Sequence, residues 1–331
     1  MMMEKHNGND FAFLLGAGAS EEAGINLSSD WREIIEPLVK DKTWQSGLQK
    51  RHKNLSGDSF ETGDLNDGEK FVRKLAFLAC NDVSYELVKV KEPFGNRADP
   101  DAASAFREVA VQLKRVTTVT DSTNLEYLSD LLHFADWRTS PARDGFAHIF
   151  TLNYDNTIEE TAKRMGYTCL SMPGQVSKQG WFRRNVEIRG INLLKINGSA
   201  DWSFHKRNTG FGVADTLLQG DAQWLPDAEN VGFLDIVDTP WATDLAQVQR
   251  TELAERLKET TFLAVLGYSF RRADINEIIL EWCRSGKAEQ VTIFDPKPSE
   301  HHFDFRETCK QSTRCVIKEK TASAAIKSFY R

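Results

Sequence analysis

The chain has 331 residues, 40% of them hydrophobic, so it is long enough for one large α/β domain with an insertion or for two domains. Its formal net charge of −6 argues against direct nucleic-acid binding, which needs a concentrated basic surface, and the short basic clusters at 181–185 and 271–272 are typical of solvated loop faces. The chain contains no apolar run of about 18 residues and no signal segment, so we expect a cytoplasmic protein without membrane association.

The cysteines argue against two kinds of site. None of the five belongs to a C-x-x-C pair, so neither a zinc ribbon nor a thioredoxin-type redox site is expected. We expect reduced, mostly buried thiols and no bound metal. The five residues are Cys80, Cys169, Cys283, Cys309 and Cys315.

The first predicted element is a buried parallel strand at 11–15 that leads into a glycine-containing turn. Gly16 and Gly18 permit close approach of a pyrophosphate, and Ser20 suits the first turn of a helix. The third glycine of the dinucleotide fingerprint would fall at Glu21, which disfavours an ordinary dehydrogenase. A tight turn without a ligand is the alternative.

The next region, 31–143, predicts a largely helical insertion into an α/β domain made of residues 1–30 and 144–331. Apolar residues recur at helical spacing in three segments, at 69–80, 102–116 and 124–134. The turn-rich stretch at 62–68 predicts a loop or lid.

The α/β pattern then resumes and predicts a doubly wound parallel sheet of the Rossmann-like class. Each predicted strand ends in glycine or polar residues, and ligands of such sheets bind outside the carboxyl ends of the strands. We therefore expect the motifs to converge on one crevice. The predicted strands are 148–152, 191–196, 261–266 and 290–294, and the predicted helices are 156–165 and 274–283.

Polar residues follow two of these strands. Thr151, Asn153 and Asp155 surround the end of the strand at 148–152, where a neutral amide can hold a water or a sugar hydroxyl. Asp155 can instead cap the helix that begins near residue 156. Asn197 follows the strand at 191–196 and precedes Gly198, which permits close ligand approach; a turn stabilised by the asparagine side chain is the alternative.

Taken together, these motifs resemble the sirtuin family, and more closely its prokaryotic sirtuin-like branch in anti-phage defence than its protein deacetylases. The resemblance covers nearly the whole chain, and the absence of zinc cysteines fits the defence branch. The segments that carry it are 16–20, 23–25, 151–155, 196–202, 267–269 with Asp274, and 293–296.

The resemblance implies NAD binding and a sirtuin-type fold. It implies that the glycine-rich turn contacts the pyrophosphate, that Gly267 and Ser269 lie on the adenosine side, and that Asp295 lies near the adenosine ribose or the adenine. The residues expected to bind NAD are Gly16, Ala17, Gly18, Ala19, Ser20, Thr151, Gly198, Ser199, Gly267, Ser269 and Asp295.

The resemblance also implies that NAD is a substrate, which the defence branch cleaves with water into nicotinamide and ADP-ribose, depleting NAD during phage infection. Asn153 matches the asparagine that orients water and ribose, and Asp155 matches the accompanying carboxylate. The catalytic residues expected from the resemblance are Asn153, Asp155 and the residue at position 197.

Asn197 departs from the family pattern, because most active relatives carry a histidine there and an amide cannot act as a general base near neutral pH. Three explanations are open: an engineered inactivating substitution, an enzyme that relies on positioning alone, or a natural pseudoenzyme. His148 and His205 are candidates to replace the missing base.

A cleaving activity must be restrained in healthy cells, which leads us to expect homo-oligomerisation, a separate sensor protein, or both, with the insertion at 31–143 in gating or assembly. The alternative is a catalytically silent module that senses NAD or ADP-ribose and signals to a partner. Lysine deacetylation is a third and weaker reading, because the zinc cysteines are absent.

Overall fold

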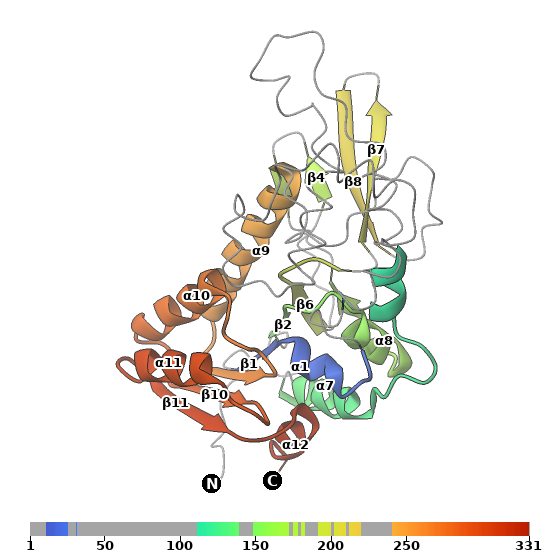
Figure 1. Ribbon diagram of the computed structural model, residues 1–331. Helices are drawn as coiled ribbons and strands as arrows, with labels where there is room; N and C mark the ends of the chain where they lie inside the picture. The colour runs from blue at the N-terminus through green and yellow to red at the C-terminus, as the bar shows by residue number, and fades with distance from the viewer. Residues whose placement is uncertain are drawn as a thin grey trace, which may run out of the picture.

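The computed structural model describes residues 11–25, 31, 111–138, 148–171, 175–177, 180–182, 191–199, 202–209, 212–219 and 240–330. The helix predicted at 69–80 and the loop predicted at 62–68 lie outside the described residues. Figure 1 shows the arrangement of the described elements.

A seven-stranded parallel sheet forms the centre of the fold, in the order β11-β10-β9-β1-β2-β6-β3. After β1, the chain adds β2, β3 and β6 on one side of it and then β9, β10 and β11 on the other side. This is the doubly wound arrangement that the sequence predicted. The strands are β1 (Phe11–Leu15), β2 (His148–Thr151), β3 (Cys169–Leu170), β6 (Ile191–Lys195), β9 (Phe262–Leu266), β10 (Gln290–Phe294) and β11 (Arg314–Lys318).

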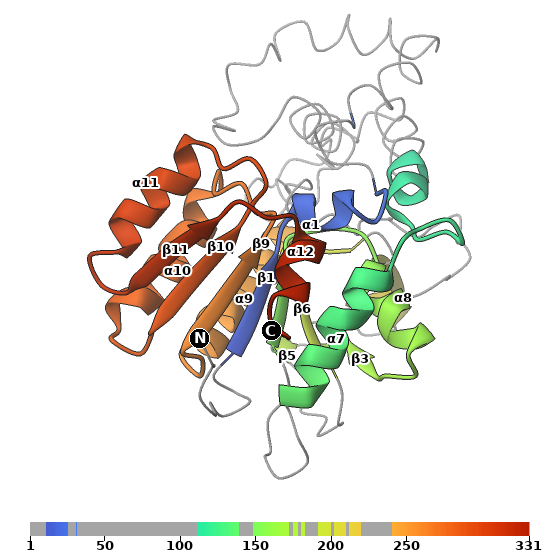
Figure 2. The ribbon, with the colours of Figure 1, turned by 90° about the horizontal axis from the view of Figure 1, so that it is seen from below.

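Helices cover both faces of this sheet. The first layer consists of α1 (Ala17–Glu21), α7 (Glu126–Arg138), α8 (Thr157–Arg164) and α12 (Ala322–Lys327). The second layer consists of α9 (Pro240–Leu257), α10 (Ala273–Arg284) and α11 (Glu300–Cys309). Figure 2 shows α7 and α12 on the near side of the strands and α9 on the far side.

The alternation of side chains along the strands explains the two layers. In β1, Phe13 and Leu15 pack against the first layer, whereas Ala12 and Leu14 pack against the second. Successive strand residues point to opposite faces, so a strand buried on both sides is a continuous apolar run. The apolar runs of the sequence therefore predicted the central strands correctly.

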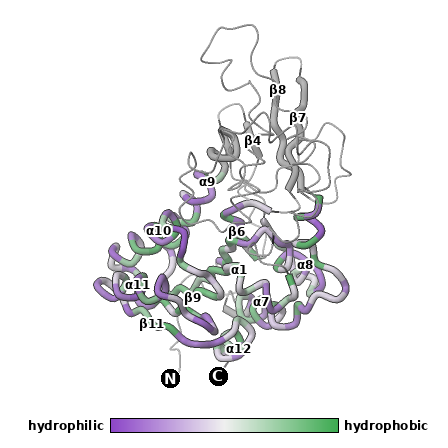
Figure 3. The backbone as a smooth tube through the Cα atoms, viewed as in Figure 1, coloured by the Kyte–Doolittle hydropathy of each residue, from purple (hydrophilic) through white to green (hydrophobic). Residues whose placement is uncertain are grey.

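Helix α10 shows how a flanking helix follows from its sequence. Its buried residues Ile275, Ile279 and Trp282 recur at helical spacing and form one apolar stripe. Asp274 lies in the first turn and Arg284 in the last, where each charge is favoured by the helix dipole. In Figure 3, α10 and α11 carry both hydrophilic and hydrophobic stretches, as expected of helices with one buried face.

The carboxyl ends of five strands lie in register. Leu15 of β1 pairs with Thr151 of β2 and with Leu266 of β9. Thr151 also pairs with Lys195 of β6, and Leu266 pairs with Phe294 of β10. The segments that follow these strands therefore meet at one edge of the sheet, which we call the carboxyl edge.

Two antiparallel strand pairs lie outside the central sheet, and the sequence analysis did not predict them. One consists of β4 (Gln175–Ser177) and β5 (Gly180–Phe182), and the other of β7 (Trp202–Thr209) and β8 (Gly212–Gln219). In Figure 1 the β7–β8 hairpin stands away from the seven-stranded sheet.

The described part of the predicted insertion contains two helical segments joined by turns at 118–125. Residues 111–117 form a helical segment, and α7 corresponds to the helix predicted at 124–134. Leu128 and Leu131 of α7 belong to the core beneath the sheet, so this part of the segment 31–143 packs on the α/β domain. The division of the chain into a domain and an insertion stays a prediction. None of the helices in the described residues is long and apolar enough to cross a membrane.

Candidate functional site

Two loops pack backbone against backbone at the carboxyl edge. The Gly16 N–H donates to the Leu266 carbonyl over 2.9 Å, and the Gly18 N–H donates to the Gly267 carbonyl over 3.0 Å. A Cβ atom on Gly267 would lie 2.4 Å from the Ala19 nitrogen, and the φ angle of Gly267 is +62°. The contact between the loops thus already requires glycine, before any ligand is considered.

Asn153 joins the end of β2 to the turn after β1. Its Nδ2 donates to the Gly16 carbonyl over 2.9 Å and to Ser20 Oγ over 2.8 Å. Its backbone N–H donates to Thr151 Oγ1 over 3.0 Å, and Thr151 Oγ1 donates to the Leu15 carbonyl over 3.5 Å. The structure thus brings Gly16, Ser20, Thr151 and Asn153 together.

The amide oxygen of Asn153 stays available. Both Nδ2 hydrogens have acceptors, whereas Oδ1 receives no hydrogen bond from the described residues. A carboxamide oxygen can accept two hydrogen bonds. Asn153 therefore combines a fixed orientation with an acceptor that a water or a sugar hydroxyl can use.

Asp155 contacts the start of α8, as in the alternative that the sequence analysis gave, but from the position before the N-cap residue Asn156. Its Oδ1 accepts hydrogen bonds from the Thr157 N–H over 3.1 Å and from Thr157 Oγ1 over 2.6 Å, at the start of α8. The residue is 5% exposed. Asp155 thus satisfies a backbone N–H of the first turn of α8, which would otherwise lack a partner inside the helix.

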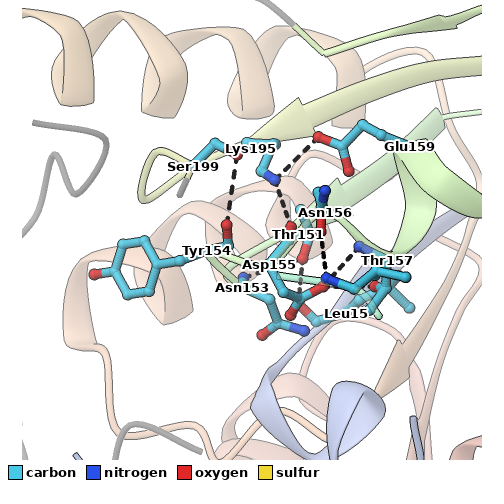
Figure 4. Close-up of polar contacts among 11 residues, drawn as sticks. Leu15, Thr151, Asn153, Tyr154, Asp155, Asn156, Thr157, Glu159, Lys195 and Ser199 are labelled. Carbon is cyan, nitrogen blue, oxygen red and sulfur yellow. Dashed lines mark hydrogen bonds and ion pairs between the residues drawn. The ribbon is translucent and has the colours of Figure 1, made fainter. Parts of the chain in front are cut away.

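Lys195 supports the same loop, and the sequence analysis missed it. Its side chain is fully buried and donates to the Asp155 carbonyl over 2.5 Å and to Glu159 Oε1 over 3.0 Å. Figure 4 shows the ammonium group between this carbonyl and Glu159 of α8. A lysine that ends an apolar strand was the available sequence signal, because a buried lysine needs a partner.

Asn197 lies two residues after the end of β6, with both ends of its carboxamide engaged. Nδ2 donates to the Leu152 carbonyl over 2.9 Å, and Oδ1 accepts a long hydrogen bond of 3.4 Å from Arg272 Nη1. Gly198 has a φ angle of +97°, which favours glycine. Ser199 is fully buried, and its Oγ donates to the Tyr154 carbonyl over 3.5 Å.

Arg272 belongs to a charged network that the sequence analysis did not identify. Its Nε and Nη2 bind the two carboxylate oxygens of Asp274 over 3.0 and 2.7 Å. Arg250 of α9 approaches the same carboxylate, with Nε 2.7 Å from Oδ2. Burial alone would raise the pKa of Asp274, but hydrogen bonds from Arg272 and the two guanidinium charges hold this pKa below its usual range.

The loop that carries Arg272 is held in an unusual conformation. Phe270 has a φ angle of +56°, which is strained for a bulky residue. Its ring packs against that of Phe305 with a centroid distance of 4.4 Å, and its carbonyl accepts from Asn276 Nδ2 over 2.8 Å. Tyr268 Oη donates to Asn276 Oδ1 over 2.8 Å. Ser269 is exposed at the tip of this loop.

Asp295 lies at the carboxyl end of β10, and its own neighbours engage both of its oxygens. Oδ1 accepts from the Lys297 N–H over 2.7 Å, and Oδ2 lies 3.3 Å from His302 Nε2. Burial alone would raise the pKa of Asp295, but the contacts with His302 and Lys297 hold it below its usual range. His302 itself closes a capping box with Ser299 at the start of α11.

Tyr127 of α7 anchors the helical turn after β1. Its hydroxyl donates to the Ala19 carbonyl. Burial, and then the negative charges of Asp155 and Glu22, raise the pKa of Tyr127. The hydroxyl therefore stays protonated and can keep donating to the turn.

His148 does not fill the place of a general base at residue 197. It is the first residue of β2 and lies at the opposite end of the strand from the carboxyl edge. Its ring contacts Arg256 Nη1 at 3.1 Å and Glu259 Oε2 at 3.7 Å, so it has a structural environment of its own. His205 lies on β7, opposite Thr216.

The described part of the chain contains no cluster of side chains that could bind a metal ion. No group of three or more histidine, cysteine, aspartate or glutamate side chains there could hold a metal ion. Cys283 and Cys309 approach each other with a sulfur–sulfur distance of 3.5 Å, and the described cysteines Cys169, Cys283, Cys309 and Cys315 are free thiols.

Several solved structures are similar to this chain. Sir2Tm bound to a propionylated peptide has 13% identity and a TM-score of 0.41, with 96% of this chain and 91% of that chain covered. Sir2 bound to an acetylated peptide has 12% identity and a TM-score of 0.42, with 96% and 91% covered. A Sir2 homolog in complex with NAD has 11% identity and a TM-score of 0.39, with 96% and 86% covered.

Comparison of the sequence with curated proteins found no match. The model of one protein family, described as the SIR2-like domain, matches residues 147–315, which is just over half of the chain. This segment includes β2, β6, β9 and β10, whose carboxyl ends carry Asn153, Asn197, Gly267 and Asp295. The chain therefore belongs to the SIR2-like domain family.

Proposed function

We propose that this protein binds NAD at the carboxyl edge and cleaves it to nicotinamide and ADP-ribose, and that this activity depletes NAD in anti-phage defence. Membership of the SIR2-like domain family supports an NAD-related function. The observation that carries the proposal is the double hydrogen bond of Asn153 to Gly16 and Ser20, which leaves Asn153 Oδ1 as a fixed acceptor beside the turn after β1.

The exposed part of the turn supports a phosphate site. Ala17 is exposed and Gly18 is half-buried, whereas Ala19 and Ser20 are buried. A pyrophosphate would therefore meet the backbone around Ala17 and Gly18, and Ser20 would act through Asn153. Ser269, exposed on the loop after β9, would lie on the adenosine side together with Gly267.

Some predicted ligand contacts would need indirect roles. Ser199 is fully buried, and both oxygens of Asp295 contact protein groups. These two residues would therefore support the loops around the site without contacting NAD. Thr151 likewise supports Asn153 through its hydroxyl, which accepts from the Asn153 N–H, and Gly198 allows the turn that follows Asn197. NAD itself would supply the reactive centre, the bond between its ribose and nicotinamide.

Cleavage breaks the bond between C1′ of the ribose and the nicotinamide nitrogen, whose electron pair leaves with neutral nicotinamide. A water oxygen then bonds to C1′ and loses one proton to solvent, which gives ADP-ribose. Asn153 Oδ1 can accept a hydrogen bond from this water or from a ribose hydroxyl and so orient the reactants. Asp155 would keep the Asn153 loop in place through Thr157, since its Oδ1 is bound there.

The second candidate is a catalytically silent module that senses NAD or ADP-ribose and signals to a partner. The geometry of Asn197 favours it, because the carboxamide is bound to Leu152 and Arg272 and cannot accept a proton near neutral pH. Loss of a general base typically costs about 10²–10⁴-fold in rate, so slow cleavage is compatible with the same geometry.

Time-resolved proton NMR of NAD with the purified chain and with its Asn197→His variant separates the two candidates. Nicotinamide release by both proteins supports an enzyme that tolerates Asn197, and release by the variant alone identifies Asn197 as inactivating. Broadened NAD signals without release support the sensor. Unchanged NAD signals with both proteins would reject the NAD site.

The position of the pyrophosphate has its own test at Ala17. Because Ala17 is exposed, Ala17→Glu adds a negative charge beside the turn with little effect on packing, and Ala17→Gln is the neutral control of similar shape. We expect calorimetry to show weaker NAD binding for Ala17→Glu than for Ala17→Gln. Equal affinities would move the phosphates away from this turn.

Restraint of the activity is part of the proposal. Homo-oligomerisation or a separate sensor protein would keep the site inactive in the cytoplasm of healthy cells, and the predicted insertion at 31–143 would serve gating or assembly. Light scattering of the purified chain with and without NAD tests the oligomer. A monomer at all protein concentrations would leave the sensor protein as the source of restraint.

A further inference from the structure

We infer that Arg272 is a positioning residue for Asn197: anchored by Asp274 and Arg250, its guanidinium fixes the orientation of the Asn197 carboxamide at the carboxyl edge. The effect of this contact on bound nucleotide rests on the proposed function, whereas the contact itself does not. The residues come from the segment after β6, from α9 and from the start of α10.

Among the described residues, the guanidinium of Arg272 donates to Asp274 and to Asn197. Nε and Nη2 form a bidentate contact with Asp274, at 3.0 and 2.7 Å, and this contact sets the plane of the group. Nη1 points to Asn197 Oδ1 at 3.4 Å. A planar fork with five donors can make both contacts at once, and a lysine ammonium cannot reproduce them.

The two partners of Asn197 allow one orientation of its amide. The Leu152 carbonyl is an acceptor and cannot donate, whereas the Arg272 guanidinium is a donor and cannot accept. A flipped carboxamide would place a donor against Arg272 and an oxygen against the Leu152 carbonyl. Arg272 thus contributes directly to selecting the orientation that the structure shows.

One donor and one acceptor of Asn197 remain after these contacts. The amide nitrogen carries two hydrogens and the oxygen has two lone pairs, and each group uses one in the contacts described. Asn197 is 8% exposed, so the remaining N–H and lone pair have a narrow approach. A nucleotide at the carboxyl edge would meet them in fixed directions.

The surroundings of Arg272 keep it in place. Arg250 Nε lies 2.7 Å from Asp274 Oδ2, so two guanidinium groups share one carboxylate. The strained Phe270 backbone directly before Arg271–Arg272 is fixed by the Phe305 ring and by Asn276. Preorganised sites keep their geometry because the residues that orient the functional groups are themselves held by further contacts.

The test follows the side-chain amide of Asn197 by proton–nitrogen NMR in the full chain, with its signals assigned by their loss in Asn197→Ala. The variants are Arg272→Met, Arg272→Lys and, as matched control, Arg284→Met. Arg284 pairs with Glu277 on α10 at 2.6 Å, and none of its hydrogen bonds reaches Asn197. Each variant is also titrated with ADP-ribose.

We expect Arg272→Met to shift the Asn197 amide signals and to speed their hydrogen exchange, and Arg284→Met to leave both unchanged. Arg272→Lys keeps the charge beside Asp274, so its melting temperature should fall less than that of Arg272→Met while the Asn197 signals still shift. If ADP-ribose binds the parent chain, its affinity should fall by up to about tenfold in Arg272→Met, the loss expected for one hydrogen bond.

Unchanged Asn197 signals in Arg272→Met or in Arg272→Lys would overturn the positioning role. Shifted signals in a chain that binds neither NAD nor ADP-ribose would uphold the positioning role and reject the proposed function. Binding of NAD together with unchanged Asn197 signals would reject the positioning role and leave the proposed NAD binding standing. The two failures are therefore distinguishable.

Discussion

Asn153 Nδ2 donates to Ser20 Oγ over 2.8 Å, and this bond ties the end of β2 to the first helical turn after β1. The two residues are far apart in sequence, yet the parallel register of Leu15 with Thr151 brings their segments together. The asparagine therefore has two tasks at one place: its nitrogen holds the turn, and its oxygen faces the proposed site.

Substitutions of Asn153 and of Ser20 together separate these tasks. Asn153→Ala removes both bonds from Nδ2 and the acceptor Oδ1, so we expect loss of NAD cleavage and a decrease of about 1–3 kcal/mol in the free energy of unfolding, with the fold retained. Ser20→Ala removes only one of the bonds and keeps Oδ1, so it should retain more turnover. Circular dichroism melting and nicotinamide release measure the two effects. Unchanged turnover in Asn153→Ala would remove Asn153 from the proposed chemistry.

The sequence predicted the central strands because each is an apolar run that ends in glycine or polar residues, and such runs are typical of strands buried on both faces. It did not predict β3, which has only two residues, or β11, whose edge position leaves Arg314 and Lys318 exposed. Edge strands lose the apolar signal because one side of the ladder meets solvent.

The sequence predicted that the segments after the central strands meet at one edge of the sheet, but not the contacts that they make there. The sequence placed glycines where a phosphate would approach, but it could not show that Gly16 and Gly18 face the backbone of Gly267, which comes about 250 residues later. It interpreted Arg271–Arg272 as a solvated face, whereas Arg272 binds Asp274 and Asn197. Long-range partners of this kind leave no pattern in the local sequence.

Gly267 gives a sharp test of the contact between the loops. In Gly267→Ala the new Cβ would lie 2.4 Å from the Ala19 nitrogen and 2.5 Å from the Gly18 carbonyl carbon, at a φ angle of +62°. We expect a loss of about 2–5 kcal/mol, the sum of left-handed strain and overpacking. Gly286→Ala is the matched control, because its φ angle is +79° but no atom lies within 4 Å of the new Cβ. Equal destabilisation of both variants, measured by urea unfolding, would contradict the close contact.

Lys195 tests the buried ion pair under the loop at 153–156. Lys195→Met removes the fully buried ammonium that pairs with Glu159, whose side chain is 12% exposed, and we expect a loss of about 3–5 kcal/mol in the free energy of unfolding. The double variant Lys195→Met/Glu159→Met should recover part of this loss, because the carboxylate that faced the ammonium is then replaced by an apolar side chain as well. The control is Lys163→Met, because Lys163 pairs with Glu160 at 3.4 Å while 77% of its side chain is exposed. Loss of this exposed pair should lower the free energy of unfolding by less than about 1 kcal/mol. A Lys195→Met variant as stable as Lys163→Met would contradict the buried pair.

Asp274 predicts a dependence of stability on pH. Its pKa is lower in the folded state than in the unfolded chain, so the stabilisation is complete above about pH 4 and is lost as the pH falls through the lowered pKa. Urea unfolding of the parent chain and of Asp274→Asn should therefore differ at neutral pH and converge in acid. Asp295 responds in the same range, but it is present in both proteins and cancels in the comparison. A difference that grew below pH 4 would contradict the ion pair with Arg272.

The Asn197→His variant tests the electrostatics that Arg272 imposes at this position. An imidazole there would face the Arg272 guanidinium, which carries a permanent positive charge and can only act as a donor, and this neighbour favours the neutral ring over the imidazolium. We expect the pKa of the introduced imidazole, followed by NMR titration, to lie below the usual value of about 6.5. The ring would then be neutral at pH 7 and able to accept a proton.

In Asn197→His/Arg272→Met the same pKa should rise, whereas Asn197→His/Arg284→Met should leave it unchanged. Identical pKa values in the single variant and in the Arg272→Met double variant would show that Arg272 does not act on the side chain at position 197.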